Sequence, residues 1–341
     1  MMPLDVAYIE ERMKYHRVPG CSIAWIEHGR LMDSKQFGTV ATWSGQRVKA
    51  DTRFNACSMS KFLTSVLVMK LVETGQVALD EPVNDRLVSW QLTDVASKRS
   101  EVTLRQVLRH ESGVIDATDS FGELDVTFGR PSMIALLNGD TPYHDGPVHV
   151  TGKPGQTFHY SDAGFCVIQL LIEDVMERPF ADVMRDELFV PLGMHASGYH
   201  FEVESVKFAS GHDKHGHSVA PIIPHYPYPA AAGLWTTTED LSRVVIEMME
   251  AVKGNSRVLS PRMVKDMLSA SSSNPFVGLG VFLDGEHGQR ELSSLGWGIG
   301  FQSMIVAYPY IGKAIIIMTN AELGVHQMDG LIGDIYRATF N

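Results

Sequence analysis

The stretch RFNACSMSKFLTSVLVMKLVETG, residues 53–75, carries a serine and a lysine three positions apart at the head of a long apolar run. The apolar residues after Ser58 recur at helical spacing and Gly75 follows the last of them, so the pattern predicts a helix between these two points. Residues three apart lie on the same face of a helix, so the side chains of Ser58 and Lys61 can meet. The segment therefore predicts a helix and a candidate nucleophile with a neighbouring amine.

The Ser58 and Lys61 pair has a chemical interpretation and a structural one. A serine hydroxyl is a poor nucleophile at neutral pH and usually needs a neighbouring base. A lysine can be that base only where burial or a nearby cation lowers its pKa, because an ordinary ammonium is protonated at pH 7. Backbone N–H groups at a helix N-terminus favour a developing oxyanion. Ser-x-x-Lys is also common on surface helices, where Ser58 would only cap the helix, so the motif needs support from other residues.

The segments around this helix predict a mixed fold. Apolar periodicity and turn residues predict three further helices and two hairpins. The helices are expected over 3–17, 163–177 and 325–340, and the hairpins over 21–38 and 301–320. The simplest arrangement is α+β: the two hairpins share one antiparallel sheet flanked by helices, an α/β sandwich, and the middle forms an all-α lobe. We expect a single domain over 1–341, with sublobes 1–57 plus 195–341 and 58–194.

Composition narrows the function classes. The chain has 341 residues, 44% of them apolar and 20% charged, which is typical of a globular protein. Its formal charge of −11 and the lack of a Lys and Arg run disfavour nucleic acid as a partner. Three cysteines among apolar neighbours suggest neither a disulfide framework nor a metal cluster. The acidic residues near the start and the lack of a long apolar span indicate a soluble, cytoplasmic protein with no membrane partner, and leave the oligomeric state open.

Further motifs follow in a recognisable order. Tyr160-Ser161-Asp162 precedes the second strong helix, and the glycine-rich LSSLGWGIGFQS, residues 292–303, precedes the last hairpin. Together with HESG at 110–113, FVPLGM at 189–194, AAGLWTTTEDL at 231–241 and IMTN at 317–320, these segments resemble the serine β-lactamase family in its class C and penicillin-binding-protein branch. That group also includes esterases, D-amino-acid peptidases and acyltransferases. The resemblance runs over almost the whole chain.

The resemblance implies a fold and a set of roles. The fold is an antiparallel sheet flanked by helices plus a helical lobe, with the site in the cleft between them. Ser58 would be the acylated nucleophile, Lys61 the adjacent amine, and Tyr160 the phenol that shuttles the proton to the leaving group. The backbone N–H groups of Ser58 and Trp297 would form the oxyanion hole, and Gly296 would let the backbone approach the substrate. The resemblance implies neither a metal nor an organic cofactor.

Asp162 is the first departure from the family pattern, which usually has an asparagine there. An ionised carboxylate only accepts hydrogen bonds, whereas an amide also donates them. Near Lys61 the carboxylate would keep the ammonium charged, which favours Tyr160 over Lys61 as the general base. The alternative is that Asp162 only caps the helix that starts near Ala163.

Ser294-Leu295-Gly296 is the second departure, because the family usually has a lysine or histidine at the first of these positions. That cation helps to hold the carboxylate of a β-lactam or a cell-wall peptide, and Ser294 carries no charge. A buried carboxylate without a cationic partner is unfavourable by several kcal/mol. We therefore expect weak or no β-lactamase activity and a preference for neutral esters or for acyl groups that carry an amine.

The stretch GHDKHGHSVAPIIPHYPYP, residues 211–229, holds several histidines and an aspartate. Without a helical i, i+4 pair or cysteine partners, zinc binding is the weaker interpretation. The stronger one is a polar loop over the mouth of the cleft, with Tyr226 and Tyr228 shaping the substrate pocket. His110 is expected to anchor the HESG turn rather than to perform chemistry.

These observations lead to a functional hypothesis with alternatives. We expect a serine hydrolase that acts through an acyl-enzyme on Ser58, most consistent with an esterase on small esters, with a small-molecule ester or amide as its partner and no cofactor. The alternatives of the same fold are a D-amino-acid amidase or aminopeptidase and an acyltransferase. A different class is a non-catalytic binding module in which the second and third motifs have degraded.

Overall fold

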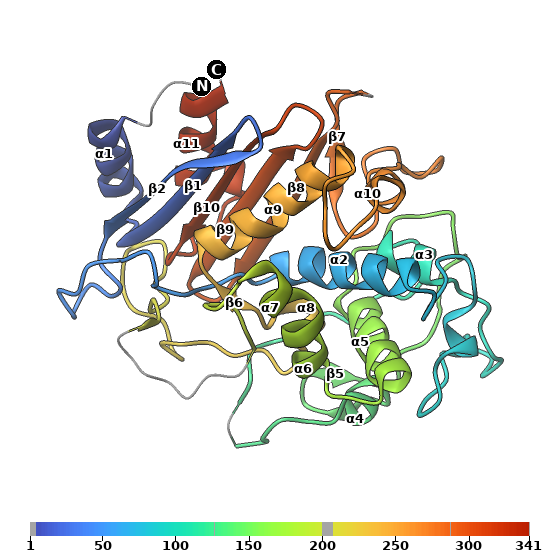
Figure 1. Ribbon diagram of the computed structural model, residues 1–341. Coiled ribbons are helices and arrows are strands. Elements are labelled where there is room, and N and C mark those ends of the chain that lie inside the picture. The colour runs from blue at the N-terminus through green and yellow to red at the C-terminus, as the bar shows by residue number, and fades with distance from the viewer. Residues whose placement is uncertain (1–4, 126, 200–206, 287, 341) are drawn as a thin grey trace.

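The computed structural model describes residues 5–340 except 126, 200–206 and 287, and its centre is a six-stranded antiparallel sheet (Figure 1). The strands lie in the order β2, β1, β10, β9, β8, β7. Their bounds are β1 Gly20–Glu27, β2 Arg30–Gly38, β7 Phe282–Asp284, β8 Glu291–Gly298, β9 Phe301–Tyr308 and β10 Lys313–Thr319. Because β1 pairs with β10, the two predicted hairpins share one sheet, which confirms the predicted arrangement.

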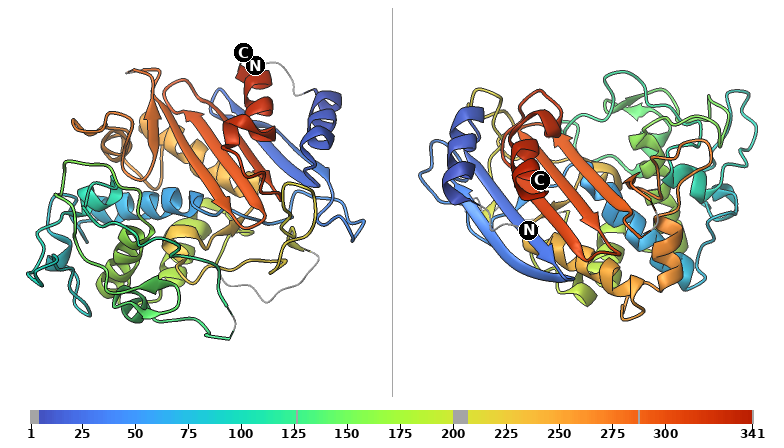
Figure 2. Two further views of the ribbon diagram at one scale, coloured as in Figure 1. Left: turned by 180° about the vertical axis from the view of Figure 1, so that it is seen from behind. Right: turned by 90° about the horizontal axis from the view of Figure 1, so that it is seen from above.

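Alternate residues of the central strands face two different layers of helices. Ile23 and Ile317 are cross-strand partners and pack against α1 Val6–His16 and α11 Leu331–Phe340. Their neighbours along the strands belong to the core on the other face of the sheet, which packs against α9 Thr238–Val252. Figure 2 shows helices on both faces of the sheet. A strand covered on both faces must be apolar throughout, which explains the run of isoleucines in β10.

Helix α2, Met59–Glu73, contacts both the sheet, at β8 and β9, and helices outside it such as α8 and α10. Nearly all of its residues are buried, as expected for a helix surrounded by protein on every side. Gly75 adopts a positive φ of 74° directly after it, so the predicted helix and its end are confirmed. Helix α5, Asp162–Met176, also matches its prediction closely, whereas the predicted closing helix begins only at Leu331.

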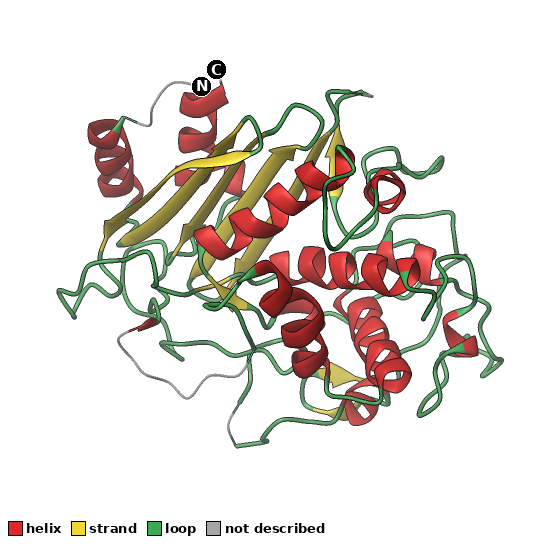
Figure 3. Ribbon diagram, viewed as in Figure 1, coloured by secondary structure: helices red, strands yellow, loops and turns green. Residues whose placement is uncertain are grey.

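Short helices and loops make up most of the region opposite the sheet (Figure 3). They are η1 Val83–Asp85, α3 Leu104–Leu108, α4 Met133–Leu137, α6 Phe180–Met184, η2 Arg185–Phe189 and α7 Val190–Leu192. The remaining elements are β3 Phe54–Asn55 paired with β6 Trp235–Thr236, β4 Asp140–Thr141 paired with β5 His144–Asp145, α8 Pro229–Ala232, α10 Pro261–Met267 and η4 Gln327–Asp329. Among the described residues, no helix combines the length and apolar character needed to cross a bilayer.

Candidate active site

A tight backbone turn presents Ser58 at the start of α2. Cys57 adopts a positive φ of 48°, a conformation that a non-glycine residue rarely takes. The turn is held by the Cys57 N–H, which donates to Asn55 Oδ1 over 2.7 Å. Ser58 is half-buried, whereas Cys57 and Met59 on either side are fully buried. The turn therefore exposes one hydroxyl at the N-terminus of a rigid, buried helix.

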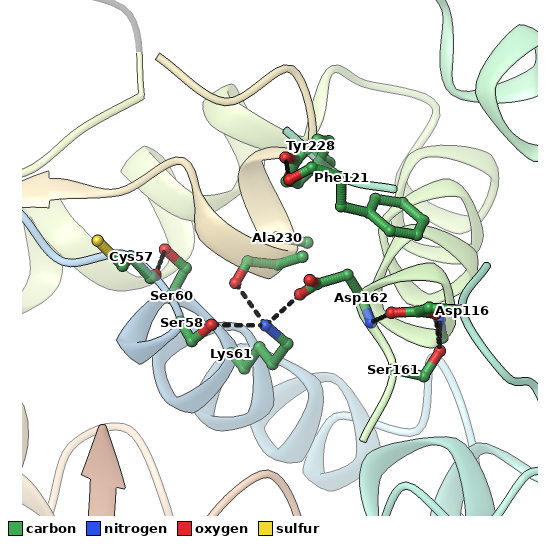
Figure 4. A network of polar contacts seen from close by, with 12 residues as sticks. Cys57, Ser58, Ser60, Lys61, Asp116, Phe121, Ser161, Asp162, Tyr228 and Ala230 are labelled. Carbon is green, nitrogen blue, oxygen red and sulfur yellow. Dashed lines mark hydrogen bonds and ion pairs between the residues drawn. The ribbon is translucent and has the colours of Figure 1, made fainter. Parts of the chain in front are cut away.

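Lys61 connects the hydroxyl of Ser58 to two other elements (Figure 4). Its Nζ lies 3.1 Å from Ser58 Oγ and 2.9 Å from the Ala231 carbonyl oxygen of α8. It also forms an ion pair with Asp162 Oδ1 at 2.5 Å. The three predicted residues Ser58, Lys61 and Asp162 thus meet at one point.

Asp162 is directed at Lys61 because other groups satisfy the N-terminus of α5. Ser161 is the N-cap, and its Oγ accepts a hydrogen bond from Gly164 N over 2.9 Å. The carboxylate of Asp116 accepts from the backbone N–H groups of Asp162 and Ala163. Of the two alternatives for Asp162, the structure thus supports the one in which the carboxylate faces the site.

Opposing effects act on the charge of Lys61. Burial by itself lowers the pKa of this amine, because the charged form is poorly solvated. The carboxylate of Asp162 and the hydroxyl of Tyr160 favour the charged form, and together they raise the pKa of Lys61 above its ordinary value. Lys61 is therefore an ammonium at neutral pH, and in that form it cannot accept a proton.

Tyr160 lies beside Lys61 at the surface of the site. Lys61 Nζ is 4.8 Å from the centroid of its ring, and 39% of the Tyr160 residue is exposed. The ring of His110 stacks against Tyr160 with centroids 4.4 Å apart and an interplanar angle of 25°. Ser58, Lys61 and Tyr160 are therefore brought together as the sequence predicted.

A narrow pocket that is partly open to solvent begins at Ser58 and Lys61. Its remaining lining residues are His110, Tyr160, Val277, Gly280, Val281, Phe282, Ser293, Ser294 and Leu295. Within this set, Lys61 is the one residue with a full charge at neutral pH, because burial and the Lys61 charge lower the pKa of His110 to about 3. The pocket is thus mainly apolar and uncharged beyond the ion pair.

Gly296 has no side chain and so allows β8 to approach the turn at 55–58 that presents Ser58. A Cβ at this position would lie 2.2 Å from the Ala56 carbonyl oxygen and 2.2 Å from Ser303 Oγ, so no other residue fits without movement. Strand β7 pairs with β8 only as far as Ser293, so the segment 294–298 is free of a described strand partner on that side. Trp297 lies in this free segment, and its backbone N–H stays our prediction for the oxyanion hole, together with that of Ser58.

The structure corrects both predicted pocket tyrosines, because neither is among the residues that line the pocket. Tyr228 is fully buried, and its hydroxyl donates to the Phe121 carbonyl, so it belongs to the core and cannot contact substrate. Tyr226 lies behind β8, where its hydroxyl accepts from the Ile299 N–H over 3.0 Å. It supports the turn after β8 and is absent from the pocket lining. In a loop, the sequence pattern does not indicate whether a tyrosine side chain faces the core or the pocket.

The histidine-rich loop has a structural role at its first histidine. Buried His212 pairs through Nδ1 with the Asn320 carbonyl over 2.9 Å, and its Nε2 accepts from the Thr42 N–H. Within the described part of the chain, no group of three or more histidine, cysteine or acidic side chains is placed to hold a metal ion.

Sequence reasoning missed the residues that complete the site from distant segments. Asp116, which orients the start of α5, and Phe282, which forms the pocket wall, carry no motif that would have identified them. The Ala231 carbonyl that binds Lys61 lies 170 residues further along the chain. It falls within the AAGLWTTTEDL segment that contributed to the family resemblance, which was the one available signal.

Comparison with known proteins places this geometry in a family. Penicillin-binding protein 4 of Amycolatopsis lactamdurans is 31% identical over 202 residues, which are 58% of this chain and 50% of that protein. The structure of EstCE1, described as a hydrolase with promiscuous acyltransferase activity, superposes with a TM-score of 0.77 at 17% identity and covers 96% of each chain. The D-amino acid amidase from Ochrobactrum anthropi SV3 superposes with a TM-score of 0.76 at 19% identity, covering 98% of this chain and 99% of the amidase.

At these sequence identities the two similar structures show only that the fold is shared. Membership of a family rests on a separate match to a family model. The chain spans between 50% and 61% of the length of the curated relatives that it matches. The family model described as Beta-lactamase matches residues 6–333. Because this match covers nearly the whole chain, the protein belongs to the beta-lactamase family.

Proposed function

We propose that the protein is a serine hydrolase that cleaves small, uncharged esters through an acyl-enzyme on Ser58. The observation that carries the proposal is the position of Lys61 Nζ, 3.1 Å from Ser58 Oγ and 2.5 Å from Asp162 Oδ1, at the head of an otherwise uncharged pocket. A hydroxyl at a helix N-terminus next to a fixed cation is suited to attack a carbonyl carbon. The developing oxyanion would be met by backbone N–H groups.

The protonation state of Lys61 supports Tyr160 as the general base. An ammonium held by Asp162 has no free electron pair, but its positive charge stabilises the negative charge that develops on the neighbouring Tyr160 oxygen during proton transfer. The Tyr160 oxygen takes the proton of Ser58 as Ser58 Oγ bonds to the carbonyl carbon. It then returns that proton to the departing alcohol as the ester bond breaks. Water attacks the acyl-enzyme by the same exchange in reverse, which releases the acid and restores Ser58.

The pocket lining supports an uncharged substrate. Ser294 is buried and neutral, and Val277, Phe282 and Leu295 add apolar surface to the lining. A carboxylate on the substrate would lose its hydration there and find no free cation, because Lys61 is already paired with Asp162. This supports weak or absent β-lactamase activity.

The same lining favours an ester over an amino-acid amide. A substrate α-ammonium group needs a carboxylate, and no aspartate or glutamate is among the residues that line the pocket. The carboxylate of Asp162, which lies beside Ser58 and Lys61, is already paired with Lys61. Amine-bearing acyl groups, which the sequence left open, are therefore less well supported than neutral ones.

Mass spectrometry of the intact protein tests the acyl-enzyme. Wild type and Ser58→Ala are exposed briefly to 4-nitrophenyl acetate, a D-amino-acid 4-nitroanilide and a β-lactam, and released chromophore is followed in parallel. We expect an acetyl adduct and turnover with the ester that depend on Ser58, and little reaction with the other two probes. An adduct that persists in Ser58→Ala contradicts Ser58 as the acylated residue. Neither an adduct nor turnover from folded wild type with any probe contradicts the proposal and favours a binding module.

A matched pair of esters tests the charge preference. The 3-carboxy derivative of 4-nitrophenyl acetate differs from the parent compound only by a carboxylate on the leaving group. We expect kcat/KM to be lower for the anionic ester by about tenfold or more, since unpaired charge is poorly tolerated in such a pocket. Equal or higher kcat/KM for the anionic ester would contradict an uncharged substrate while leaving the acyl-enzyme intact.

A further inference from the structure

We propose that His110 is a positioning residue that holds Tyr160 against Lys61 for proton transfer. The inference rests on the proposed role of Tyr160 in the acyl-enzyme reaction. His110 follows the short helix α3 Leu104–Leu108 and is buried, with its ring lining the pocket beneath Tyr160.

Two hydrogen bonds fix the backbone on both sides of Tyr160 to His110. The His159 N–H donates to the His110 carbonyl oxygen over 2.8 Å. The Ser161 N–H donates to His110 Nδ1 over 3.0 Å. Tyr160 lies between these two attachment points, so its backbone has little freedom to shift relative to His110.

The His110 ring also supports the Tyr160 ring from its buried side. The two rings stack with centroids 4.4 Å apart, whereas the other stacked neighbour of Tyr160, Phe282, is at 6.4 Å. Phe158 and Phe165 hold the His110 ring in turn, with centroids 5.7 and 5.4 Å away. Because Tyr160 is 39% exposed, its outer side contributes little packing, and its orientation depends on the rings beneath it.

The hydrogen bond from Ser161 defines the tautomer of His110. A backbone N–H can only donate, so Nδ1 must be unprotonated and the neutral ring carries its proton on Nε2. Burial and the positive charge of Lys61 lower the pKa of His110 to about 3, so the ring stays neutral at neutral pH. His110 therefore supports Tyr160 without exchanging protons itself.

The two contributions of His110 can be separated by substitution. His110 has a positive φ of 56°, a conformation that asparagine also tolerates. In His110→Asn the side-chain oxygen can replace Nδ1 as acceptor for Ser161, but the stacking ring is lost. In His110→Phe the ring remains and the acceptor is lost, and His110→Ala lacks both.

Steady-state kinetics with 4-nitrophenyl acetate test the role. We expect kcat to fall by about 10- to 100-fold in His110→Ala and by less in His110→Asn and His110→Phe, with KM changed by about twofold at most. Folded variants with wild-type kcat would overturn the proposal.

A second background shows whether the effect passes through Tyr160. Once Tyr160→Phe has removed the hydroxyl, adding His110→Ala should lower kcat by no more than about twofold, because there is no longer a proton carrier to position. A purely structural role predicts instead that His110→Ala lowers kcat by the same factor in both backgrounds. Equal factors would therefore contradict a positioning role.

Crystal structures of the same variants decide the positional claim independently of turnover. If wild type forms no acyl adduct, the proposed function fails, but the position of Tyr160 can still be compared. We expect the Tyr160 ring to leave its place beside Lys61 in His110→Ala. In His110→Asn we expect the backbone over 159–161 to be retained. A Tyr160 ring unmoved in His110→Ala would overturn the inference.

Discussion

Lys61 Nζ lies closer to Asp162 Oδ1, at 2.5 Å, than to the Ser58 hydroxyl that it would assist, at 3.1 Å. The amine of this site is thus committed to a carboxylate before substrate arrives. In the proposed reaction Lys61 therefore acts electrostatically, and proton transfer is assigned to Tyr160. Asp162, which departs from the family pattern, is the residue on which this assignment rests.

Replacing Asp162 by asparagine should destabilise the protein in a pH-dependent way. The raised pKa of Lys61 in the folded state means that the ion pair contributes stability below the unfolded-state pKa of about 10.4, and that this contribution is lost as pH rises further. We expect Asp162→Asn to lower the free energy of unfolding by about 1–3 kcal/mol at pH 7. Urea unfolding from pH 7 to 11 measures the difference, which should shrink above about pH 10.

Asp33→Asn provides the control for this comparison. Asp33 is an exposed carboxylate 3.9 Å from Lys35, so its loss should change stability by less than about 0.5 kcal/mol. If Asp162→Asn behaves like this control, the buried ion pair contributes no net stability.

His110 should make the native protein less stable in mild acid. The pKa of His110 is lowered to about 3 in the folded protein and is about 6.5 in the unfolded chain. The stability that the neutral ring contributes is therefore fully present above pH 6.5 and is lost as pH falls toward 3. Between these values the unfolded chain binds one proton more, which lowers stability by about 1.4 kcal/mol per pH unit. Urea unfolding at pH 5 and pH 7 should show a shallower loss for His110→Asn than for wild type. Parallel losses would contradict a neutral, buried His110.

Gly296→Ala should damage both the fold and the reaction. The new Cβ would meet the Ala56 carbonyl at 2.2 Å, which forces β8 away from the turn that presents Ser58. We expect a loss of about 2 kcal/mol or more in stability, and acylation slower by about 100-fold or more if Trp297 supplies an oxyanion-hole donor. Gly122→Ala is the matched control, because a Cβ there has no neighbour within 4 Å. Gly296→Ala with the control's acylation rate would remove Trp297 from the oxyanion hole.

Phe282→Ala should widen the range of esters that react. Phe282 forms part of the apolar wall of the pocket. We compare two esters of the same acid, one with a bulky branched alcohol and one with ethanol as the leaving group. Removing the ring of Phe282 should raise the ratio of kcat/KM for the branched ester to kcat/KM for the ethyl ester by about tenfold. Competition between the two esters measures this ratio directly. An unchanged ratio would show that Phe282 does not limit the size of the substrate.

Tyr160→Phe should separate chemistry from stability. The Tyr160 hydroxyl is the proposed proton carrier, so its loss should lower kcat by about 100- to 10,000-fold. Because the residue is 39% exposed and its ring is retained, the free energy of unfolding should change by less than about 1 kcal/mol. The rate of acyl-adduct formation, followed by mass spectrometry, distinguishes this outcome from that of Lys61 acting as the base, in which case adduct formation would remain near the wild-type rate.

Several features of the fold and of the site are encoded in short-range sequence patterns and were predictable from them. The periodicity after Ser58 predicted α2, and the Ser58 and Lys61 contact followed from their spacing of three on one helix face. Alternating and continuous apolar runs predicted both hairpins. Motifs in the right order indicated the family and, with it, the meeting of Tyr160 with the nucleophile. Each of these signals is carried by residues a few positions apart, where helix and strand geometry alone decides which side chains are neighbours.

Contacts between side chains from distant segments could not be predicted in this way and became visible only in the folded molecule. Asp162 was equally able to cap its own helix, and Ser161 and Asp116 occupy that role in the folded protein. Tyr228 turned into the core, and Phe282 became a pocket wall. The positions of Asp162, Tyr228 and Phe282 follow from the packing of the whole molecule, because unpaired buried charge and unfilled space are both unfavourable. No local window of the sequence contains the partners between which that choice is made.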